Sequence, residues 1–147
     1  DVSVPFDRFC YRVTSPIDDA TRRIVGFGGR ALSADVPAKY LNSPDTPLFH
    51  KGRLLYNLHQ ARAPAHERGA LIVVEGYVDV IALSAAGFPN AAAPLGTALT
   101  EDQLALAWRV ADEPVLCFDG DKAGRRAAYR ALDLALPALT AGKSLRF

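Results

Sequence analysis

The sequence contains no methionine, and its two cysteines, Cys10 and Cys117, lack a metal-ligand spacing such as Cys-x-x-Cys. A chain of 147 residues without an initiator is expected to be a piece of a longer protein. Two cysteines so far apart give little reason to expect a secreted disulfide framework, so the predicted compartment is a reducing cytoplasm. No apolar run approaches the ~18 residues of a membrane span, and the acidic start differs from a signal peptide. We therefore expect a soluble protein without a membrane partner.

Several common catalytic motifs are also missing. The sequence has no Walker A motif and no G-x-S-x-G, which excludes obvious P-loop NTPases and serine hydrolases. The glycines at 26, 28 and 29 do not have the spacing of a dinucleotide fingerprint. The three histidines have no metal-ligand spacing, so no role is assigned to them.

Net charge is only +1, but the charge is unevenly distributed. Residues 1–62 hold nine Lys/Arg and six Asp/Glu, whereas residues 63–147 hold eight and ten. A basic leading segment beside an acidic one fits a protein that holds a polyanion near a cation. Ordinary scatter of surface charge fits an imbalance of this size equally well.

The first third of the chain predicts a small α+β unit. Residues 6–14 and 22–32 read as an antiparallel strand pair, in which the glycines mark a bulge or a close backbone approach. Three prolines make residues 33–50 an irregular and functional loop. Residues 51–62 form a short helix, and the small residues of 61–69 mark a boundary. We therefore place one unit at 1–66 and a second at 67–147.

From residue 71 onward, short apolar runs alternate with helical patterns. Alternating strands and helices in pieces this short predict parallel strands joined by right-handed crossovers. The expected fold is α/β, with a parallel sheet flanked by helices. The expected strands are 71–74, 90–94 and 115–118, and the expected helices are 77–86, one opened by the Thr100 capping box, and 122–136.

Acidic residues end two of these apolar runs. Glu75 follows the first, while Asp119 and Asp121 follow the third. Because parallel strands deliver their carboxyl ends to one edge of a sheet, the three carboxylates should meet there. Asp79 lies one helical turn beyond Glu75 and could face the same place. Carboxylate oxygens suit Mg²⁺, so we predict a metal site formed by these four acids.

Each of these signals also has a plain structural explanation. Asp-x-Asp is common in loops, and Asp121 alone would cap the helix that follows it. Glu75 could cap the helix that begins at Tyr77, and Asp79 could be a solvated acid of its first turn. The basic side chains near the 33–50 loop could each be an ordinary surface charge.

The motifs as an ordered set resemble a known family. Residues 74–79 (VEGYVD), 95–97 (LGT) and 118–124 (FDGDKAG) are similar to the Toprim fold shared by bacterial primases, topoisomerases and some nucleases. Residues 26–30 (GFGGR), 39–44 (KYLNSP) and 49–53 (FHKGR) resemble the segment that precedes Toprim in the bacterial DnaG-type replicative primase. The similarity covers nearly the whole chain.

The resemblance implies a nucleotidyltransferase, a DNA-directed RNA polymerase. It would make RNA primers from ribonucleoside triphosphates on a single-stranded DNA template during replication, in the cytoplasm, with Mg²⁺ or Mn²⁺. The implied catalytic residues are Glu75, Asp119 and Asp121, and Asp79 joins them as a metal ligand. The implied nucleic-acid and nucleotide contacts are Arg12, Arg30, Lys39, Tyr40, Asn42 and Lys51.

The resemblance is incomplete in ways that shape the expectations. Cys10 stands where the family often has an arginine, so it is not assigned a contact. The chain stops at Phe147, before the place where the family has a further acidic pair. It also lacks the family's zinc-binding module at the amino end and its helicase-binding region at the carboxyl end. We therefore expect that the 147 residues alone bind the metal weakly and make little primer.

Three other functions remain open on the sequence. A Toprim nuclease or topoisomerase would break phosphodiesters rather than form them. A receiver-like signalling domain would also cluster acids around Mg²⁺ and would accept phosphate on Asp119. A non-catalytic domain that binds metal or nucleic acid would hold DNA without turnover.

Overall fold

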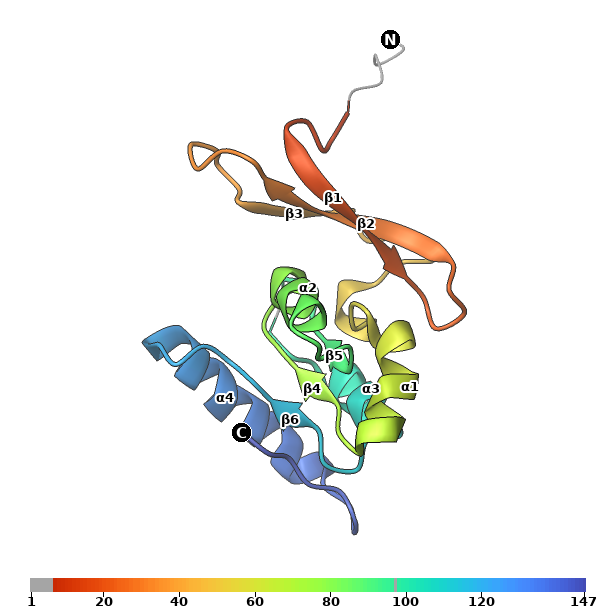
Figure 1. Ribbon diagram of the computed structural model, residues 1–147. Coiled ribbons are helices and arrows are strands. Elements are labelled where there is room, and N and C mark those ends of the chain that lie inside the picture. The colour runs from red at the N-terminus through yellow and green to blue at the C-terminus, as the bar shows by residue number, and fades with distance from the viewer. Residues whose placement is uncertain (1–6, 97) are drawn as a thin grey trace.

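The structure is a computed structural model, and it describes residues 7–96 and 98–147. Its leading part is an antiparallel sheet in the order β1-β2-β3 (Figure 1), formed by β1 (Arg12–Asp18), β2 (Ile24–Ala31) and β3 (Tyr40–Asn42). The predicted strand pair is confirmed, although β1 begins later than residue 6, which lies outside the described residues. The prediction that residues 33–50 are irregular is wrong at β3. The three residues of β3 pair with the edge of β2 that β1 does not occupy.

Glycines in β2 allow other groups to approach the strand closely, as the sequence predicts. A Cβ at Gly26 would lie 3.3 Å from the Phe49 ring, and one at Gly29 would lie 2.6 Å from Phe9 Cδ1. Side chains of ordinary size at these positions would collide with both rings. The absence of side chains at Gly26 and Gly29 therefore lets Phe49 and Phe9 cover the two faces of the sheet at these points.

The connection to the second part of the chain is helical. A 3-10 turn, η1 (Lys51–Arg53), precedes helix α1 (Leu58–Arg68), so the helix begins later and ends later than expected. Its buried residues Leu58, Ala61 and Ala65 recur at helical spacing and pack into the core. Two of the small residues of 61–69, Ala61 and Ala65, are therefore core contacts of a helix, and the predicted boundary after residue 66 falls inside α1.

The second part contains the expected parallel sheet, in the order β5-β4-β6. Figure 1 shows β4 between its two partners, with the helices arranged around them. Ile72 of β4 pairs with Ala91 on one side and with Val115 on the other. The elements are β4 (Ile72–Val73), α2 (Tyr77–Ala85), β5 (Ala91–Ala92), α3 (Glu101–Val110), β6 (Val115–Leu116), α4 (Lys122–Ala135) and a final 3-10 turn, η2 (Leu136–Ala138).

Successive side chains of these short strands point to opposite faces of the sheet, so they pack into two separate hydrophobic cores. Val73, Ala92 and Leu116 pack with residues of α1, α3 and α4 on one face of the sheet. On the other face, Val74 and the neighbouring β5 residues pack against Val80 of α2. Burial on both faces explains why these strands read as continuous apolar runs.

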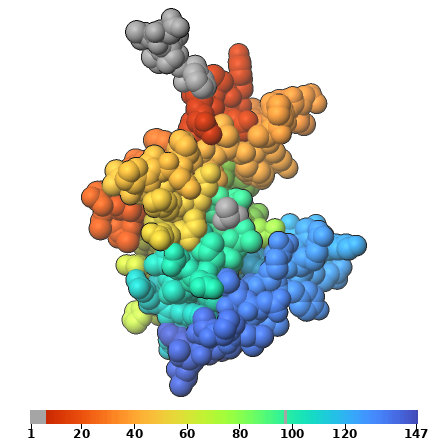
Figure 2. Space-filling model, turned by 180° about the vertical axis from the view of Figure 1, so that it is seen from behind, coloured from red at the N-terminus to blue at the C-terminus, as the bar shows by residue number. Residues whose placement is uncertain are grey.

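Helix ends follow the sequence signals. Thr100 Oγ1 accepts from the Gln103 N–H at 3.2 Å, and Gln103 Oε1 accepts from the Thr100 N–H at 3.1 Å, which completes the predicted capping box. Gly87 follows α2 with φ +90°, as a glycine after a helix end should. The buried Gln103 amide also donates to the Lys51 and Leu54 carbonyls at 2.8 Å, which ties α3 to η1. Seen from behind, the yellow segment around η1 lies between the antiparallel sheet and α3 (Figure 2).

Within residues 7–96 and 98–147, no helix has the length and apolar character needed to cross a membrane.

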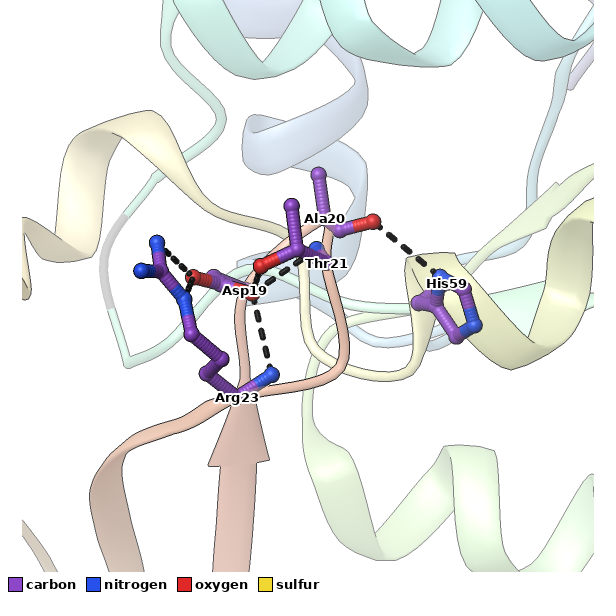
Figure 3. Close-up of polar contacts among 5 residues, drawn as sticks. All are labelled: Asp19, Ala20, Thr21, Arg23 and His59. Carbon is purple, nitrogen blue, oxygen red and sulfur yellow. Dashed lines mark hydrogen bonds and ion pairs between the residues drawn. The ribbon is translucent and has the colours of Figure 1, made fainter.

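A charged turn joins β1 to β2 and touches α1 (Figure 3). Asp19 Oδ1 accepts from the N–H and the hydroxyl of Thr21, both at 2.7 Å, and from the Arg23 N–H at 3.0 Å. Asp19 Oδ2 lies 2.8 Å from the Arg23 guanidinium. The carbonyl of Ala20 faces His59 Nδ1 of α1 at 3.2 Å. The Thr21 hydroxyl and then the Arg23 N–H hold the pKa of Asp19 well below its usual range.

The Asp19 contacts predict how stability depends on pH. Because its pKa is lower in the folded than in the unfolded chain, Asp19 stabilises the fold above its unfolded pKa of about 3.9. That contribution is lost as the pH falls below this value towards the folded pKa. Urea unfolding of the wild type and Asp19→Asn should therefore show a stability difference at pH 6 that shrinks at pH 3. An unchanged difference would contradict the assignment, and Asp133→Asn, on the exposed side of α4, is the control.

The close approach of α4 to the segment that follows β6 predicts a strong requirement for Gly124. This buried glycine lies against the backbone of Asp119, where an added Cβ would overlap the carbonyl oxygen and lie 2.7 Å from the carbonyl carbon. Gly124→Ala should lower the free energy of unfolding by about 1–3 kcal/mol in a urea titration, because backbone cannot move aside as a flexible side chain does. Gly120→Ala is the matched control, since no atom lies within 4 Å of its added Cβ. Equal stability of the two variants would show that α4 is not held in this way.

Candidate active site

Glu75 and Asp119 lie next to each other at the carboxyl edge of the parallel sheet. Glu75 Oε1 accepts a hydrogen bond from the backbone N–H of Asp119 at 2.9 Å. The contact follows from the sheet order, because β4 and β6 are parallel neighbours and each acid comes shortly after its strand. Both side chains are exposed, so Glu75 does not sit in the dry environment that the preceding apolar run suggests.

Asp79 lies near this pair but is engaged with its own helix. Its Oδ2 accepts from the N–H of Gly76, the residue before α2, at 3.0 Å. This contact is one half of a capping box. Locally, Asp79 is therefore an acid of the first turn of α2, which is the plain structural explanation given for it above. The exposed carboxylate still faces the same cleft as Glu75 and Asp119.

Asp121 points to the start of α4 rather than to this cleft. Its Oδ1 accepts from the N–H groups of Ala123 at 2.7 Å and Gly124 at 2.8 Å. The bond from Gly124 and then that from Ala123 lower the pKa of Asp121. The expectation that Asp119 and Asp121 point towards the same metal site is therefore not met. The reason is that two backbone N–H groups of α4 bind the Asp121 carboxylate.

The acids do not form a ready metal cage. Among the described residues, no three side chains of Asp, Glu, His or Cys are grouped closely enough to hold an ion. The carboxylates nevertheless suit Mg²⁺, which keeps several waters and binds through one or two carboxylates together with substrate phosphates. This arrangement suits an ion that arrives together with a ligand better than an ion that the protein binds permanently. The residues that would contact the ion are Glu75, Asp79 and Asp119.

The cleft beside these acids has a volume of about 320 Å³ and is shared by both sheets. The antiparallel sheet contributes two residues of β3, and the parallel sheet contributes the segments that follow β4, β5 and β6. The lining residues are Tyr40, Asn42, Glu75, Gly76, Tyr77, Val78, Asp79, Gly96 and Asp119.

Basic side chains surround Tyr40 at the mouth of the cleft. Arg30 of β2 pairs directly with Tyr40 of β3, and its guanidinium carbon lies 6.0 Å from the centre of the ring. Lys39 Nζ lies 5.8 Å from the same ring. These cations could attract phosphate while the half-exposed ring offers an apolar face. Asn42 lies deeper, and its Nδ2 donates to the Leu95 carbonyl at 2.9 Å.

Arg12 is on the other face of the antiparallel sheet. It pairs with Ala31, and its Cδ would lie 3.2 Å from a Cβ at Gly29, whereas Tyr40 belongs to the opposite face. Its guanidinium donates to the Ala38 carbonyl at 2.7 Å, so it secures the approach to β3. Arg12 also donates to the Lys39 carbonyl at 3.4 Å, so it contacts the backbone before β3 and does not belong to the cleft lining.

Two further predicted features differ in their relation to the cleft. Lys51 lies in η1 against α3, and it does not belong to the cleft lining. The motif at residues 95–97 contributes Gly96 to the cleft, while Thr97 lies outside the described residues. Gly96 has φ +73°, a backbone conformation that favours glycine.

Tyr77 also lines the cleft, although sequence reasoning assigned it no role. It opens α2 and is only 5% exposed, with its ring against Tyr40 at 5.7 Å and Tyr56 at 5.8 Å between centroids. Burial and the neighbouring Tyr40 raise the pKa of Tyr77, so its hydroxyl stays protonated at neutral pH. The only sequence signal for Tyr77 is an aromatic residue two positions after an acid that ends a strand. The same pattern is equally typical of a buried core residue.

Comparisons with known proteins give this geometry a family. Residues 1–62 match the family model of the DNA primase catalytic core, N-terminal domain, and residues 69–145 match that of the Toprim domain. The chain belongs to the DNA primase catalytic core family. Its carboxyl part is a Toprim domain, and the parallel sheet with an antiparallel unit before it confirms the predicted fold class.

Individual relatives agree with this membership. The DNA primase of Escherichia coli strain K12 is 52% identical over 142 residues, which cover 97% of this chain and 24% of that protein. A crystal structure of a DNA primase domain from Pseudomonas aeruginosa matches with a TM-score of 0.91 and 51% identity, covering 100% of this chain and 46% of that one. A structure of the DnaG primase catalytic domain bound to ssDNA has a TM-score of 0.87 and 52% identity, covering 96% and 44%. The chain thus spans about a quarter of the length of its curated relatives.

The two possible roles of Asp121 can be separated by substitution. Asn can accept the same two backbone bonds, whereas Ala cannot, so Asp121→Ala should loosen the first turn of α4 and Asp121→Asn should retain it. Amide hydrogen exchange should report faster exchange at Ala123 and Gly124 in the Ala variant only. Equal exchange in both variants would contradict the capping role seen here.

Proposed function

We propose that this chain is part of the catalytic core of a bacterial replicative primase, which makes RNA primers on single-stranded DNA. The proposed reaction joins a ribonucleoside triphosphate to a growing 3′ hydroxyl and releases pyrophosphate. The observation that carries the proposal is the contact between Glu75 and Asp119 in a cleft bordered by Tyr40 and Asn42. Membership of the primase core family supports it, as does the ssDNA complex of a relative.

In this proposal the acids position a triphosphate. Glu75, Asp79 and Asp119 would hold Mg²⁺ or Mn²⁺, which neutralises charge on the phosphates when bound. Asp121, which does not belong to the cleft lining, would join them through Oδ2, because both of its backbone bonds at α4 go to Oδ1. Glu75 orients the Asp119 backbone through its hydrogen bond, and as a carboxylate it is also suited to moving a proton from an attacking hydroxyl.

The basic mouth of the cleft would hold nucleic acid and nucleotide. Arg30 and Lys39 supply positive charge beside the half-exposed Tyr40 ring, on which a base can stack. Contacts of this kind go mainly to phosphate, so binding should depend weakly on sequence and strongly on salt. Arg12 and Lys51 remain assigned to more distant parts of the same template path.

The larger setting follows from the proposed identity. Residues 1–66 would form the nucleic-acid-facing unit and residues 67–147 the catalytic one, with α1 continuous between them. The whole protein would work in the cytoplasm at the replication fork with a replicative helicase. Its zinc would belong to a separate module.

A substitution at Glu75 tests the proposed reaction. Gln at this position keeps an oxygen for the Asp119 N–H and removes only the charge. In the full-length protein that carries this chain, Glu75→Gln should lower primer synthesis from labelled ribonucleotides at least about a hundredfold, as loss of a group preorganised for charge does. Calorimetry should show weaker Mn²⁺ binding by the same variant, with its melting temperature unchanged.

The control and the contrary outcomes are distinct. Glu101→Gln removes an exposed acid of α3 outside the cleft lining and should leave synthesis intact. Shortened DNA in place of growing products would favour a Toprim nuclease. Full synthesis by Glu75→Gln would remove the assigned role of the acid pair.

A further inference from the structure

The hydroxyl of Tyr77 is buried without a hydrogen bond. The side chain lines the cleft and is 5% exposed, and its oxygen has no partner among the described residues. A buried polar group left unpaired costs about 1–3 kcal/mol, so such groups are rare in native structures and ask for an explanation. A phenylalanine would fill the same space between Tyr40 and Tyr56 at lower cost.

A second unpaired atom lies beside it. The Asn42 amide is oriented by the bond from its Nδ2 to the Leu95 carbonyl, at 2.9 Å. This bond leaves Oδ1 on the other side of the amide, where it is also buried and unpaired among the described residues. Asn42 thus presents an acceptor next to the cleft, and its orientation is fixed by the backbone of the segment after β5.

Gly28 shows that these two atoms border one small space. A Cβ built on Gly28 would lie 3.2 Å from Asn42 Oδ1 and 3.4 Å from Tyr77 Cζ, the ring carbon that carries the hydroxyl. Gly28 pairs with Asn42 across the sheet, so the strand register itself puts a residue without a side chain at this point. Both polar groups therefore lie against the same side-chain-free stretch of β2.

The hydrogen-bonding properties of the pair select a ligand group. Asn42 Oδ1 can only accept, so the ligand must bring a donor, which a fully ionised phosphate lacks. The Tyr77 hydroxyl can donate or accept. A hydroxyl group satisfies both, because it donates to one oxygen and accepts from the other.

Two arguments indicate that this hydroxyl belongs to a sugar. One is the position of the pair within the cleft, and the other is that templated synthesis must accept all four bases. In a nucleoside triphosphate the ribose is the part next to the phosphates, which would lie at the acids of the same cleft. Base edges differ among the four nucleotides, whereas the ribose hydroxyls are common to all of them. We propose that Tyr77 and Asn42 bind a ribose hydroxyl of the incoming nucleotide and thereby favour ribonucleotides, a role that rests on the function proposed above.

Access to the pair requires one neighbour to move. Solvent does not reach either oxygen in the structure. Tyr40 meets the Tyr77 ring edge-on at an interplanar angle of 88° and is itself 47% exposed, so its ring has room to turn into the cleft. A nucleotide that stacks on Tyr40 would thus uncover the atoms that read its sugar.

Calorimetric binding to the full-length protein that carries this chain, with Mg²⁺, tests the proposal. The ligands are ATP, its 2′-deoxy analogue, its 3′-deoxy analogue and the other three ribonucleoside triphosphates. The wild type should bind ATP about tenfold more tightly than at least one deoxy analogue, the effect of one buried hydrogen bond. Tyr77→Phe should abolish this preference, and Tyr129→Phe, which removes an exposed hydroxyl from α4, should keep it.

Thermal unfolding separates this role from a structural one. Because the hydroxyl is unpaired in the absence of ligand, Tyr77→Phe should melt at the same temperature as the wild type or higher. A side chain kept for stability would give the opposite shift. Reduced sugar preference together with undiminished stability is the expected signature.

The outcomes distinguish this proposal from the one on which it rests. Nucleotide binding without a ribose preference, or a preference that survives Tyr77→Phe, overturns the role of Tyr77 and leaves the primase function standing. Failure of every triphosphate to bind the wild type overturns nucleotide binding by this cleft, and the ribose contact with it. Binding of ATP but not of the other three ribonucleoside triphosphates shows that the pair reads a base, which also overturns the proposal.

Discussion

The hydrogen bond from the Asp119 N–H to Glu75 Oε1 joins the carboxyl ends of two adjacent parallel strands. It exists because β4 is central and β6 is its direct neighbour, so the residues that follow them leave the sheet at the same edge. Everything in the cleft is arranged around this edge. The Glu75 carboxylate is held by a backbone donor and remains exposed, which leaves its second oxygen free to bind a cation.

Close backbone packing fixes the geometry on both sides of that contact. Gly124 lets the first turn of α4 rest on the backbone of Asp119, and Asp121 closes the same turn with two hydrogen bonds. Gly28 lets the antiparallel sheet rest on Tyr77 at the start of α2. The two glycines thus bring separate elements towards one cleft, at points where any side chain would hold them apart.

The cleft also contains groups that are poorly satisfied in the free protein. Within the part of the chain that the structure describes, the buried oxygens of Tyr77 and Asn42 have no hydrogen-bond partner, and the acids of the cleft form no salt bridge. Such arrangements lower stability and are typical of sites that complete their interactions with a ligand. The rest of the chain offsets this cost with apolar cores on both faces of the parallel sheet.

The sequence by itself determined the alternation of strands and helices, the helix caps at Gly87 and Thr100, and the identity of the acids. These features are local, since each depends on residues within a few positions of one another. Apolar runs that end in acid and glycine also predicted which edge of the sheet would carry the site, because parallel strands share one direction.

Only the tertiary structure decided which groups meet across that edge. The Asp121 carboxylate binds the backbone of α4 and does not line the cleft. Its direction depends on how the turn at Gly120 folds, which the spacing of the acids along the sequence does not specify. The pairing of Arg12 with Ala31, one residue from the Arg30–Tyr40 pair, places Arg12 and Tyr40 on opposite faces of the sheet, and this register depends on strand pairing that no local pattern specifies. The pairing of Gly28 with Asn42, and the packing of both on Tyr77, joins three segments far apart in the chain, so no local pattern could reveal it.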